Sequence, residues 1–142
     1  MLFIDYMNFL GAKNQSIHIQ PPVTNGDRLL FRVYDNASPI GYARLKKVRS
    51  RKIISSNTID MFDPNGVDSC ELKMIEVAQN YRQRGVGTSL LNEVIRYCQD
   101  SNICCITGEI KGDLRVLKSW YRSKGFTVND NNRIELLPAA NS

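Results

Sequence analysis

The stretch with the clearest capacity for chemistry is a turn of arginine and glycine residues, Arg82-Gln83-Arg84-Gly85-Val86-Gly87. Its glycines leave the neighbouring backbone amides unscreened by side chains, and the apolar residues that follow recur at helical spacing. The first amides of a helix have no intrahelical acceptor and lie at the positive end of the helix dipole. Such a turn can bind an anion, such as a pyrophosphate placed over Gly85 to Thr88. A glycine-rich connection that binds nothing is the alternative.

The residues on either side of this turn predict a strand before it and a helix after it. Residues 71–77 form a short, mostly apolar run that suits a buried strand, and the apolar residues between Gly85 and Gln99 follow one stripe of a helix. A second apolar run at Ile103 to Ile110 predicts a strand that pairs with the first. A strand, helix and strand of this size favour a parallel pair with a right-handed crossover.

The N-terminal half predicts antiparallel strands. Ser16 to Gln20 alternates as a strand does, and we expect Pro21 and Pro22 to end it. Residues Arg28 to Tyr34 and Ile40 to Val48 have the spacing of a hairpin.

The C-terminal part predicts a capped helix and two short strands. Asp113 is suited to cap a helix that ends at Gly125, with the closing strands at 126–128 and 133–137. Together, the elements predict an α/β (α+β) fold with a mixed sheet of six or seven strands. The sheet is mainly antiparallel, has one parallel βαβ crossover and is flanked by helices. We expect one domain over residues 1–142, with its ligand-binding core at about 71–126.

The composition is that of a globular protein with excess positive charge. The 142 residues are 42% hydrophobic and 23% charged, with a net charge of +5. These values fit one folded domain, and the charge implies attraction to an anionic ligand or partner. Six cations between Arg44 and Lys52 partly alternate with apolar residues, which predicts a strand with a solvated basic face.

Targeting and metal signals are absent from the sequence pattern. The first ten residues are apolar but contain Asp5 and no Lys or Arg, which predicts a packed amphipathic segment rather than a signal peptide. No run approaches the roughly 20 apolar residues of a membrane span, so we expect a cytoplasmic protein without a membrane partner. Four cysteines lack CxxC spacing and His18 is the only histidine, so we expect reduced cysteines and no metal.

Two separated motifs resemble the GCN5-related N-acetyltransferase (GNAT) family. The turn from Arg82 to Gly87 is similar to the family's acyl-CoA pyrophosphate turn, and Tyr121-Arg122-Ser123-Lys124-Gly125-Phe126 is similar to the ending of its fourth helix. The resemblance is strongest from Glu71 to Phe126. In this chain Gln79 stands where many members have proline, and Gly112-Asp113 stand where many have asparagine.

The resemblance implies that an acetyl group moves from acetyl-CoA directly to an amine of a small molecule or protein. An amine attacks only when neutral, so a base is needed; Glu71 occupies the position of a catalytic Glu in some members, and Glu76 is a second candidate. Tyr121 is the expected acid that returns a proton to the thiolate. Each residue also has a purely structural alternative. Glu71 would be a carboxylate at the strand end that pairs with a cation, and Tyr121 would be a buried aromatic residue of the helix. The cofactor-binding residues implied are Ile75, Glu76, Val77, Arg82, Gln83, Arg84, Gly85, Val86, Gly87 and Thr88.

Two other functions stay open at this point. One is a catalytically silent acyl-CoA-binding regulatory module that keeps the fold. The other, less favoured, is acetylation of an aminoacyl-tRNA amine, with the basic residues binding the RNA. The sequence leaves the acceptor, the acyl chain and the oligomeric state open, a homodimer included.

Overall fold

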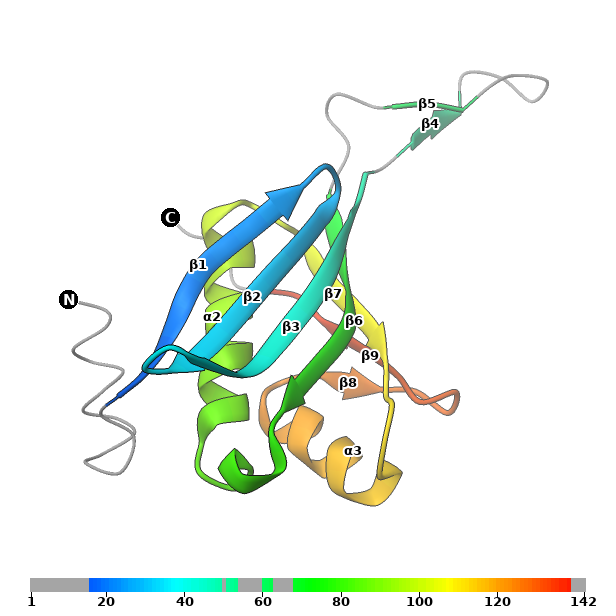
Figure 1. Cartoon of the computed structure of the whole chain (residues 1–142). Helices are drawn as coiled ribbons and strands as arrows, with labels where there is room; N and C mark the ends of the chain where they lie inside the picture. Colours follow the sequence, from blue (N-terminus) through cyan, green and yellow to red (C-terminus); the bar gives the residue numbers. More distant parts are fainter. Residues whose placement is uncertain (1–15, 50, 54–59, 63–67, 139–142) are drawn as a thin grey trace. The chain divides into compact units, whose positions relative to one another are not determined.

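A mixed sheet of seven strands is the main feature of the computed structural model, which describes residues 16–49, 51–53, 60–62 and 68–138 (Figure 1). The strand order is β1-β2-β3-β6-β7-β9-β8, and β4 and β5 form a separate antiparallel pair. The strands are β1 (Ile17–Asn25), β2 (Arg28–Asp35), β3 (Ser38–Val48), β4 (Arg51–Ile53), β5 (Asp60–Phe62), β6 (Ser69–Val77), β7 (Cys105–Glu109), β8 (Thr127–Val128) and β9 (Arg133–Leu136). β6 and β7 are parallel, as the sequence predicts. The predicted mixed sheet is therefore confirmed.

Two α-helices and one 3-10 turn complete the described elements. They are η2 (Gln79–Tyr81), α2 (Val86–Asp100) and α3 (Leu114–Ser123). The Asp113 carboxylate caps α3 by accepting hydrogen bonds from the Arg115 and Val116 amides at 3.1 and 3.4 Å. Gly125 follows the helix with φ of +95°, a conformation that favours glycine. Both ends of the predicted second helix are thus confirmed.

The chain divides into two compact units, and β3, β6 and α2 contribute residues to both. Unit 1 comprises Met1–Leu45 and Lys73–Arg96, and unit 2 comprises Lys46–Leu72 and Tyr97–Ser142. The expectation of one domain over residues 1–142 stays a prediction.

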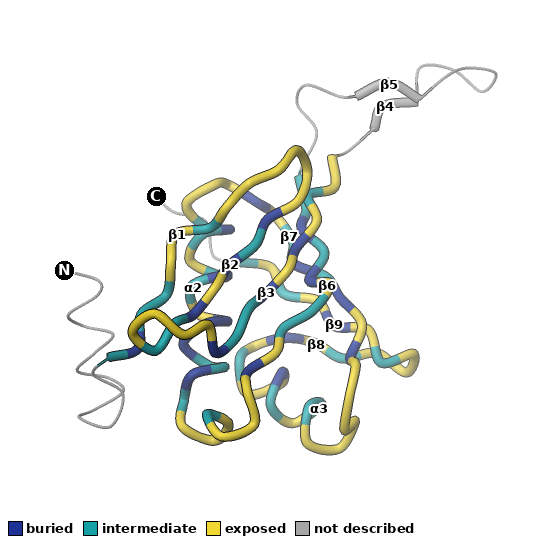
Figure 2. Tube along the Cα trace, viewed as in Figure 1, coloured by how far each residue is buried: buried dark blue, intermediate teal, exposed yellow. Residues whose placement is uncertain are grey.

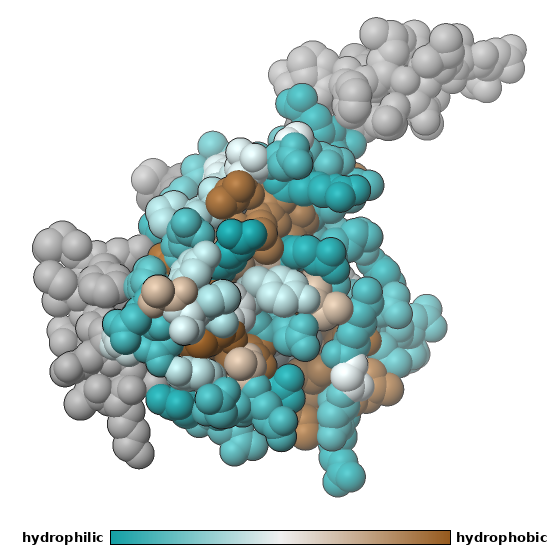
Figure 3. Space-filling model, in the orientation of Figure 1, coloured by the Kyte–Doolittle hydropathy of each residue, from teal (hydrophilic) through white to brown (hydrophobic). Residues whose placement is uncertain are grey.

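Unit 1 contains β1, β2, most of β3 and most of α2, which covers one face of these strands (Figure 1). On β2, Leu29, Phe31 and Val33 are buried, and the residues between them are more exposed (Figure 2). The helix contributes the buried side chains Val86, Leu90, Leu91 and Val94. Burying this apolar stripe against the strands holds α2, and therefore its first turn, in place. On the other face of the strands, the described residues present a surface where polar and apolar side chains are interspersed (Figure 3).

The prolines of β1 do not end the strand, so the prediction that they do is wrong. β1 runs from Ile17 to Asn25 and pairs with β2 on both sides of Pro21-Pro22, with a register shift between Gln20 and Val23. Proline is compatible with an outer strand or a bulge, where its missing N–H interrupts no ladder hydrogen bond. β1 is outermost in the strand order.

Unit 2 contains the parallel pair and the C-terminal hairpin. β7 pairs with residues 69–72 of β6 on one side and with β9 on the other. A Cβ at Gly108 would lie 3.0 Å from the Leu72 carbonyl oxygen, so glycine allows the close approach of these strands. The predicted strands at 103–110, 126–128 and 133–137 are confirmed in shorter form.

Two sequence predictions concern the chain ends and membranes. The predicted amphipathic segment of the first ten residues lies outside the described residues. In the part of the chain that the structure describes, no helix has the length and apolarity that a membrane crossing requires.

Candidate active site

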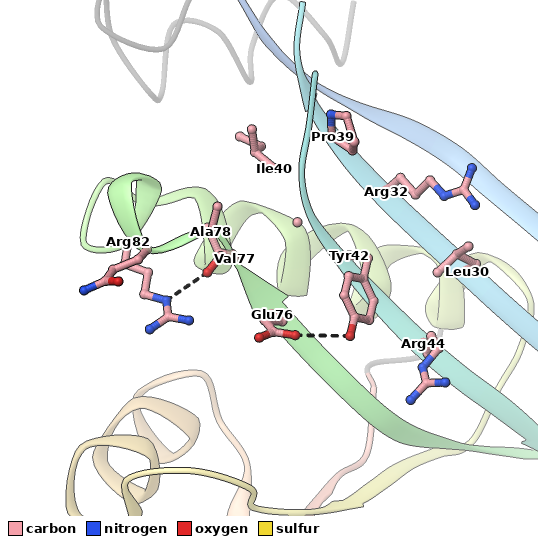
Figure 4. A pocket seen from close by; sticks show the side chains of 12 residues that line it. Leu30, Arg32, Pro39, Ile40, Tyr42, Arg44, Glu76, Val77, Ala78 and Arg82 are labelled. Atoms are coloured by element: carbon pink, nitrogen blue, oxygen red, sulfur yellow. Dashed lines mark hydrogen bonds between the residues drawn. The ribbon is translucent and has the colours of Figure 1, made fainter. Parts of the chain in front are cut away.

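A pocket of about 680 Å³ opens on unit 1 where β2, β3, the end of β6 and the turn after it meet (Figure 4). It combines apolar side chains with charged ones. The lining residues are Leu30, Arg32, Pro39, Ile40, Gly41, Tyr42, Arg44, Glu76, Val77, Ala78, Gln79 and Arg82. Its size is that of a small-molecule site.

Close packing of β3 against β6 brings the pocket residues together. A Cβ at Gly41 would lie only 2.7 Å from the Glu76 carbonyl oxygen and 3.0 Å from Val33 Cγ1. The Ala78 amide donates to the Ile40 carbonyl oxygen at 2.7 Å. Glycine at position 41 therefore permits the backbone spacing on which the pocket depends.

The pattern of burial along β6 changes within the strand. Cys70 and Leu72 are buried, but a strict two-residue alternation would then bury residue 76, and instead Glu76 is exposed and Val77 is buried. A change of this kind accompanies a bulge or a splay, where backbone groups can leave the ladder. It turns the Glu76 carboxylate outward, into the pocket.

Glu76 and Tyr42 form a hydrogen-bonded pair in the pocket. The Tyr42 hydroxyl donates to Glu76 Oε2 at 3.1 Å (Figure 4). Partial burial, and then the hydrogen bond to the carboxylate, raises the pKa of Tyr42. The phenol therefore stays a donor, and the other carboxylate oxygen of Glu76, Oε1, is available as an acceptor.

The predicted phosphate turn follows η2 and leads directly into α2. Gln83 and Gly85 have φ of +61° and +83°. The Ser89 amide donates to the Gly85 carbonyl oxygen at 3.0 Å, so the amides of Gly85, Val86 and Gly87 precede the helical ladder. No acidic residue lies in the first turn of the helix. This geometry fits a phosphate group at the helix N-terminus.

The arginines of this turn are held by the backbone. Arg82 Nε donates to the Val77 carbonyl oxygen at 2.8 Å, and Arg84 donates through its guanidinium to the Asn80 carbonyl oxygen at 3.2 Å. These contacts fix the shape of the turn.

A side-chain network ties η2 to the end of β2. The Asp35 carboxylate accepts hydrogen bonds from the Ser16 and Tyr81 hydroxyls. These two bonds, Ser16 first, lower the pKa of Asp35, and the Asp35 carboxylate raises the pKa of Tyr81. The Arg84 guanidinium carbon lies 4.7 Å from the Tyr81 ring centroid, a cation–π distance. The network therefore connects the strands to the segment that carries the phosphate turn.

Tyr121 lies on α3 in unit 2. Its side chain is 5% exposed, and its ring contacts the Trp120 and Phe126 rings edge-on, with centroids 4.9 and 5.4 Å away. Burial raises the pKa of Tyr121 to about 12. A buried aromatic residue and a proton donor both fit these observations.

Glu71 also lies in unit 2, where it has a cationic neighbour. Its Oε2 lies 3.8 Å from an Arg133 guanidinium nitrogen. This pairing is the structural alternative that the sequence leaves open for Glu71. The catalytic role of Glu71 stays a prediction, and Glu76 is the carboxylate that lines the pocket.

Several pocket residues could not be predicted from the sequence. Arg32 and Tyr42 belong to no motif, and Arg44 is expected only as part of a solvated basic face. Their one signal is strand alternation, which places all three on the exposed side of β2 and β3. The cavity itself depends on Gly41 and on the changed alternation of β6.

Metal-ligating side chains do not cluster within the described residues: no group of three or more His, Cys, Asp or Glu occurs there. The expectation of a metal-independent protein stays a prediction.

One family model matches the chain over residues 6–126, and it describes the acetyltransferase (GNAT) family. A comparison with curated proteins gives no match.

Solved structures with a similar fold include a mutant of the toxin AtaT, with 11% identity and a TM-score of 0.64, covering 87% of this chain and 90% of that one. AtaT has also been solved with the C-terminus of the antitoxin AtaR and acetyl-CoA. The PaiA N-acetyltransferase of Thermoplasma acidophilum, in complex with coenzyme A, has 21% identity and a TM-score of 0.58, with coverages of 78% and 61%. Arabidopsis thaliana Naa50, bound to the bisubstrate analogue CoA-Ac-MVNAL, has 18% identity and a TM-score of 0.60, with coverages of 75% and 71%.

Proposed function

Because the chain belongs to the acetyltransferase (GNAT) family, a family of acyltransferases, we propose that it moves an acetyl group from acetyl-CoA directly to a primary amine of a small molecule or a protein. The proposal also includes a cytoplasmic location, because Cys70, Cys98, Cys104 and Cys105 are all free thiols.

The turn at the start of α2 supports acetyl-CoA as the donor. Its backbone amides and the helix dipole suit a pyrophosphate, and Gly85 has the positive φ that such a turn requires. Two proteins of similar fold have been solved with acetyl-CoA or coenzyme A. This turn is the observation that carries the proposal.

The pocket beside β6 supports an amine acceptor. At neutral pH an amine with a pKa of about 8 to 10 is mostly protonated and must lose a proton before it attacks. In the proposed reaction, Glu76 accepts that proton directly or through water, since its carboxylate lines the pocket and Tyr42 holds it in place. The amine nitrogen bonds to the acetyl carbon and the bond from that carbon to sulfur breaks.

The departing thiolate needs a proton, and Tyr121 is the proposed donor. The phenol of Tyr121 is protonated at neutral pH, as an ordinary tyrosine is, and burial raises its pKa further, to about 12. A backbone amide between Ile75 and Val77 is the proposed donor to the oxygen that becomes negative during attack.

The proposal is tested by free-thiol release from acetyl-CoA in the presence of amines, peptides and aminoacyl-tRNA. Release that depends on one acceptor class supports the transferase and names that class. Calorimetric binding of coenzyme A without release by any acceptor would instead support a silent acyl-CoA-binding module.

The phosphate turn has its own test in Gly87→Leu. Leucine is a good helix former, so α2 should persist, but its side chain would cover the first amides of the helix. We expect coenzyme A affinity to fall at least about tenfold in calorimetry, the loss of roughly one good charge-assisted hydrogen bond. Asn92→Leu, at an exposed position further along α2, is the control that should bind normally. Unchanged affinity in Gly87→Leu would show that the phosphate lies elsewhere.

A further inference from the structure

The charged groups of the pocket are unbalanced. Its lining includes the guanidinium groups of Arg32, Arg44 and Arg82 but only one carboxylate, that of Glu76. Arg82 is oriented by the Val77 carbonyl oxygen, and Glu76 accepts the Tyr42 hydroxyl. The pocket therefore carries an excess of positive charge before any ligand enters it.

Arg32 and Arg44 have no carboxylate partner among the residues that the structure describes. They project from the neighbouring strands β2 and β3, on the side where Leu30 and Tyr42 also lie (Figure 4). Both are exposed, so neither guanidinium is needed for packing. Arginine binds carboxylate and phosphate groups through paired hydrogen bonds, and this makes the two side chains a site for an anion.

The apolar lining adds a second feature. Leu30, Pro39 and Ile40 line the same pocket as the arginines and Glu76. A ligand with a short aliphatic segment could contact these side chains while its two ends meet opposite charges. An acceptor with only positive charges would be repelled by the arginines and would meet a single carboxylate.

We propose that the acceptor is an amine that also carries an anionic group, a carboxylate or a phosphate, bound by Arg32 and Arg44 while Glu76 faces the amine. This inference rests on the proposed function, because it assigns the pocket to the acceptor. It narrows the acceptor from any primary amine to an amine with a built-in negative charge, and it disfavours polyamines.

The first test compares amines of equal length and different charge by thiol release. The probes are 4-aminobutanoate, its neutral amide 4-aminobutanamide and the dication 1,4-diaminobutane. A second pair, phosphoethanolamine and ethanolamine, distinguishes phosphate from carboxylate. We expect the anionic member to have a kcat/KM at least about tenfold higher than its neutral counterpart, the effect of one charge-assisted contact. Equal or better use of the neutral or cationic probes would overturn the inference.

The second test reverses the charges of the site. In Arg32→Glu and Arg44→Glu, the KM for the anionic amine should rise about tenfold or more, and the KM for its neutral counterpart should change little. Arg28→Glu is the matched control, since Arg28 lies on β2, is exposed and does not line the pocket. The KM for acetyl-CoA should stay the same in all three variants. A rise in that KM equal to the rise for the amine would assign the arginines to the donor's phosphates and overturn the inference.

A binding measurement separates failure of the inference from failure of the proposed function. Phosphoethanolamine, 4-aminobutanoate and their counterparts ethanolamine and 4-aminobutanamide are titrated into the protein without acetyl-CoA, with the arginine side-chain NMR signals as readout. If no amine releases thiol, the transferase proposal fails. Selective binding of phosphoethanolamine or 4-aminobutanoate that Arg32→Glu and Arg44→Glu abolish would still support the anion site, and absence of such binding would overturn it.

Discussion

At the scale of single residues, the buried phenol of Tyr121 fits two roles, proton donation and packing. The hydroxyl keeps its proton far above neutral pH, with a pKa raised to about 12, and a protonated phenol can donate to a thiolate whose reference pKa is about 8.5. The same burial also holds the ring against Trp120 and Phe126. Only the loss of the hydroxyl, with the ring kept, distinguishes proton donation from packing.

We predict that Tyr121→Phe lowers kcat by about 10² or more, the range expected for a lost general acid, while coenzyme A affinity is unchanged. Thiol release and calorimetry measure the two quantities. Tyr97→Phe, on α2, is the control and should keep full activity. Full activity in Tyr121→Phe would leave this residue with a packing role alone.

Comparing the stability of Tyr121→Phe with that of the wild type at high pH shows whether the Tyr121 hydroxyl is buried. Tyr121 ionises at about pH 12 when folded and near pH 10 when unfolded, so the unfolded chain releases this proton first as the pH rises. Its contribution to stability is intact below pH 10 and is lost as the pH rises to about 12, by roughly 1.4 kcal/mol per unit. Urea unfolding at pH 9 and pH 11 should show a smaller decline in Tyr121→Phe.

Two isosteric variants distinguish whether Glu76 or Glu71 acts as the general base. Glu76→Gln removes the carboxylate that lines the pocket, and we expect kcat to fall by about 10² or more. Loss of the partly exposed pair with Arg133 in Glu71→Gln should cost at most about 1 kcal/mol of stability. Thiol release and urea unfolding give both values. A larger loss of kcat in Glu71→Gln would restore the base that the family resemblance implies.

At the scale of elements, the network of Asp35, Tyr81 and Arg84 connects β2 to the turn before α2. Coenzyme binding should depend on it, because η2 lies between the end of β6 and the turn from Arg82 to Gly85. The network needs an ionised Asp35, whose pKa lies below its ordinary value of 3.8. Its contribution to stability is therefore present above about pH 4 and is lost as the pH falls through the lower, folded pKa.

We predict that Tyr81→Phe raises the KM for acetyl-CoA several-fold, with kcat nearly unchanged, because the network orients the turn without contacting the reacting atoms. Steady-state kinetics at saturating acceptor measure this split. Tyr34→Phe, at a tyrosine of β2 that stacks on His18, is the control. A fall in kcat with KM unchanged would contradict a positioning role.

The sequence predicts a helix or strand well where its formation depends only on residues nearby in the chain. The stripe of α2 and the Asp113 cap are such cases, because helix periodicity and capping depend on nearby residues. It fails at Pro21-Pro22, because the cost of proline in a strand depends on whether that strand is outermost. Pairing with a single neighbour, and a register shift at the prolines, make them acceptable in β1.

At the scale of the whole molecule, the candidate site is less predictable than the fold. The phosphate turn is a contiguous motif and could be read directly. Arg32, Tyr42 and Glu76 come from three strands, and only the pairing of those strands brings them into one pocket. The changed alternation in β6, which exposes Glu76, has no local signature in the run from Leu72 to Val77.

The thiols provide a test of the described fold as a whole. Cys104 is exposed, Cys70 and Cys98 are buried, and burial followed by a contact with Glu135 raises the pKa of Cys105 to about 11. We predict that Ellman's reagent modifies one thiol, Cys104, rapidly in the native protein, and the rest slowly or only after unfolding. Cys104→Ser should remove the rapid phase, and a rapid phase of more than one thiol would contradict the described burial.

The paired prolines of β1 bear on how copies of this protein can meet. Proline has no backbone N–H, so the Pro21-Pro22 pair interrupts the hydrogen bonding that a second chain would need to extend the sheet at β1 into a fibril. Self-association through that edge is thus discouraged.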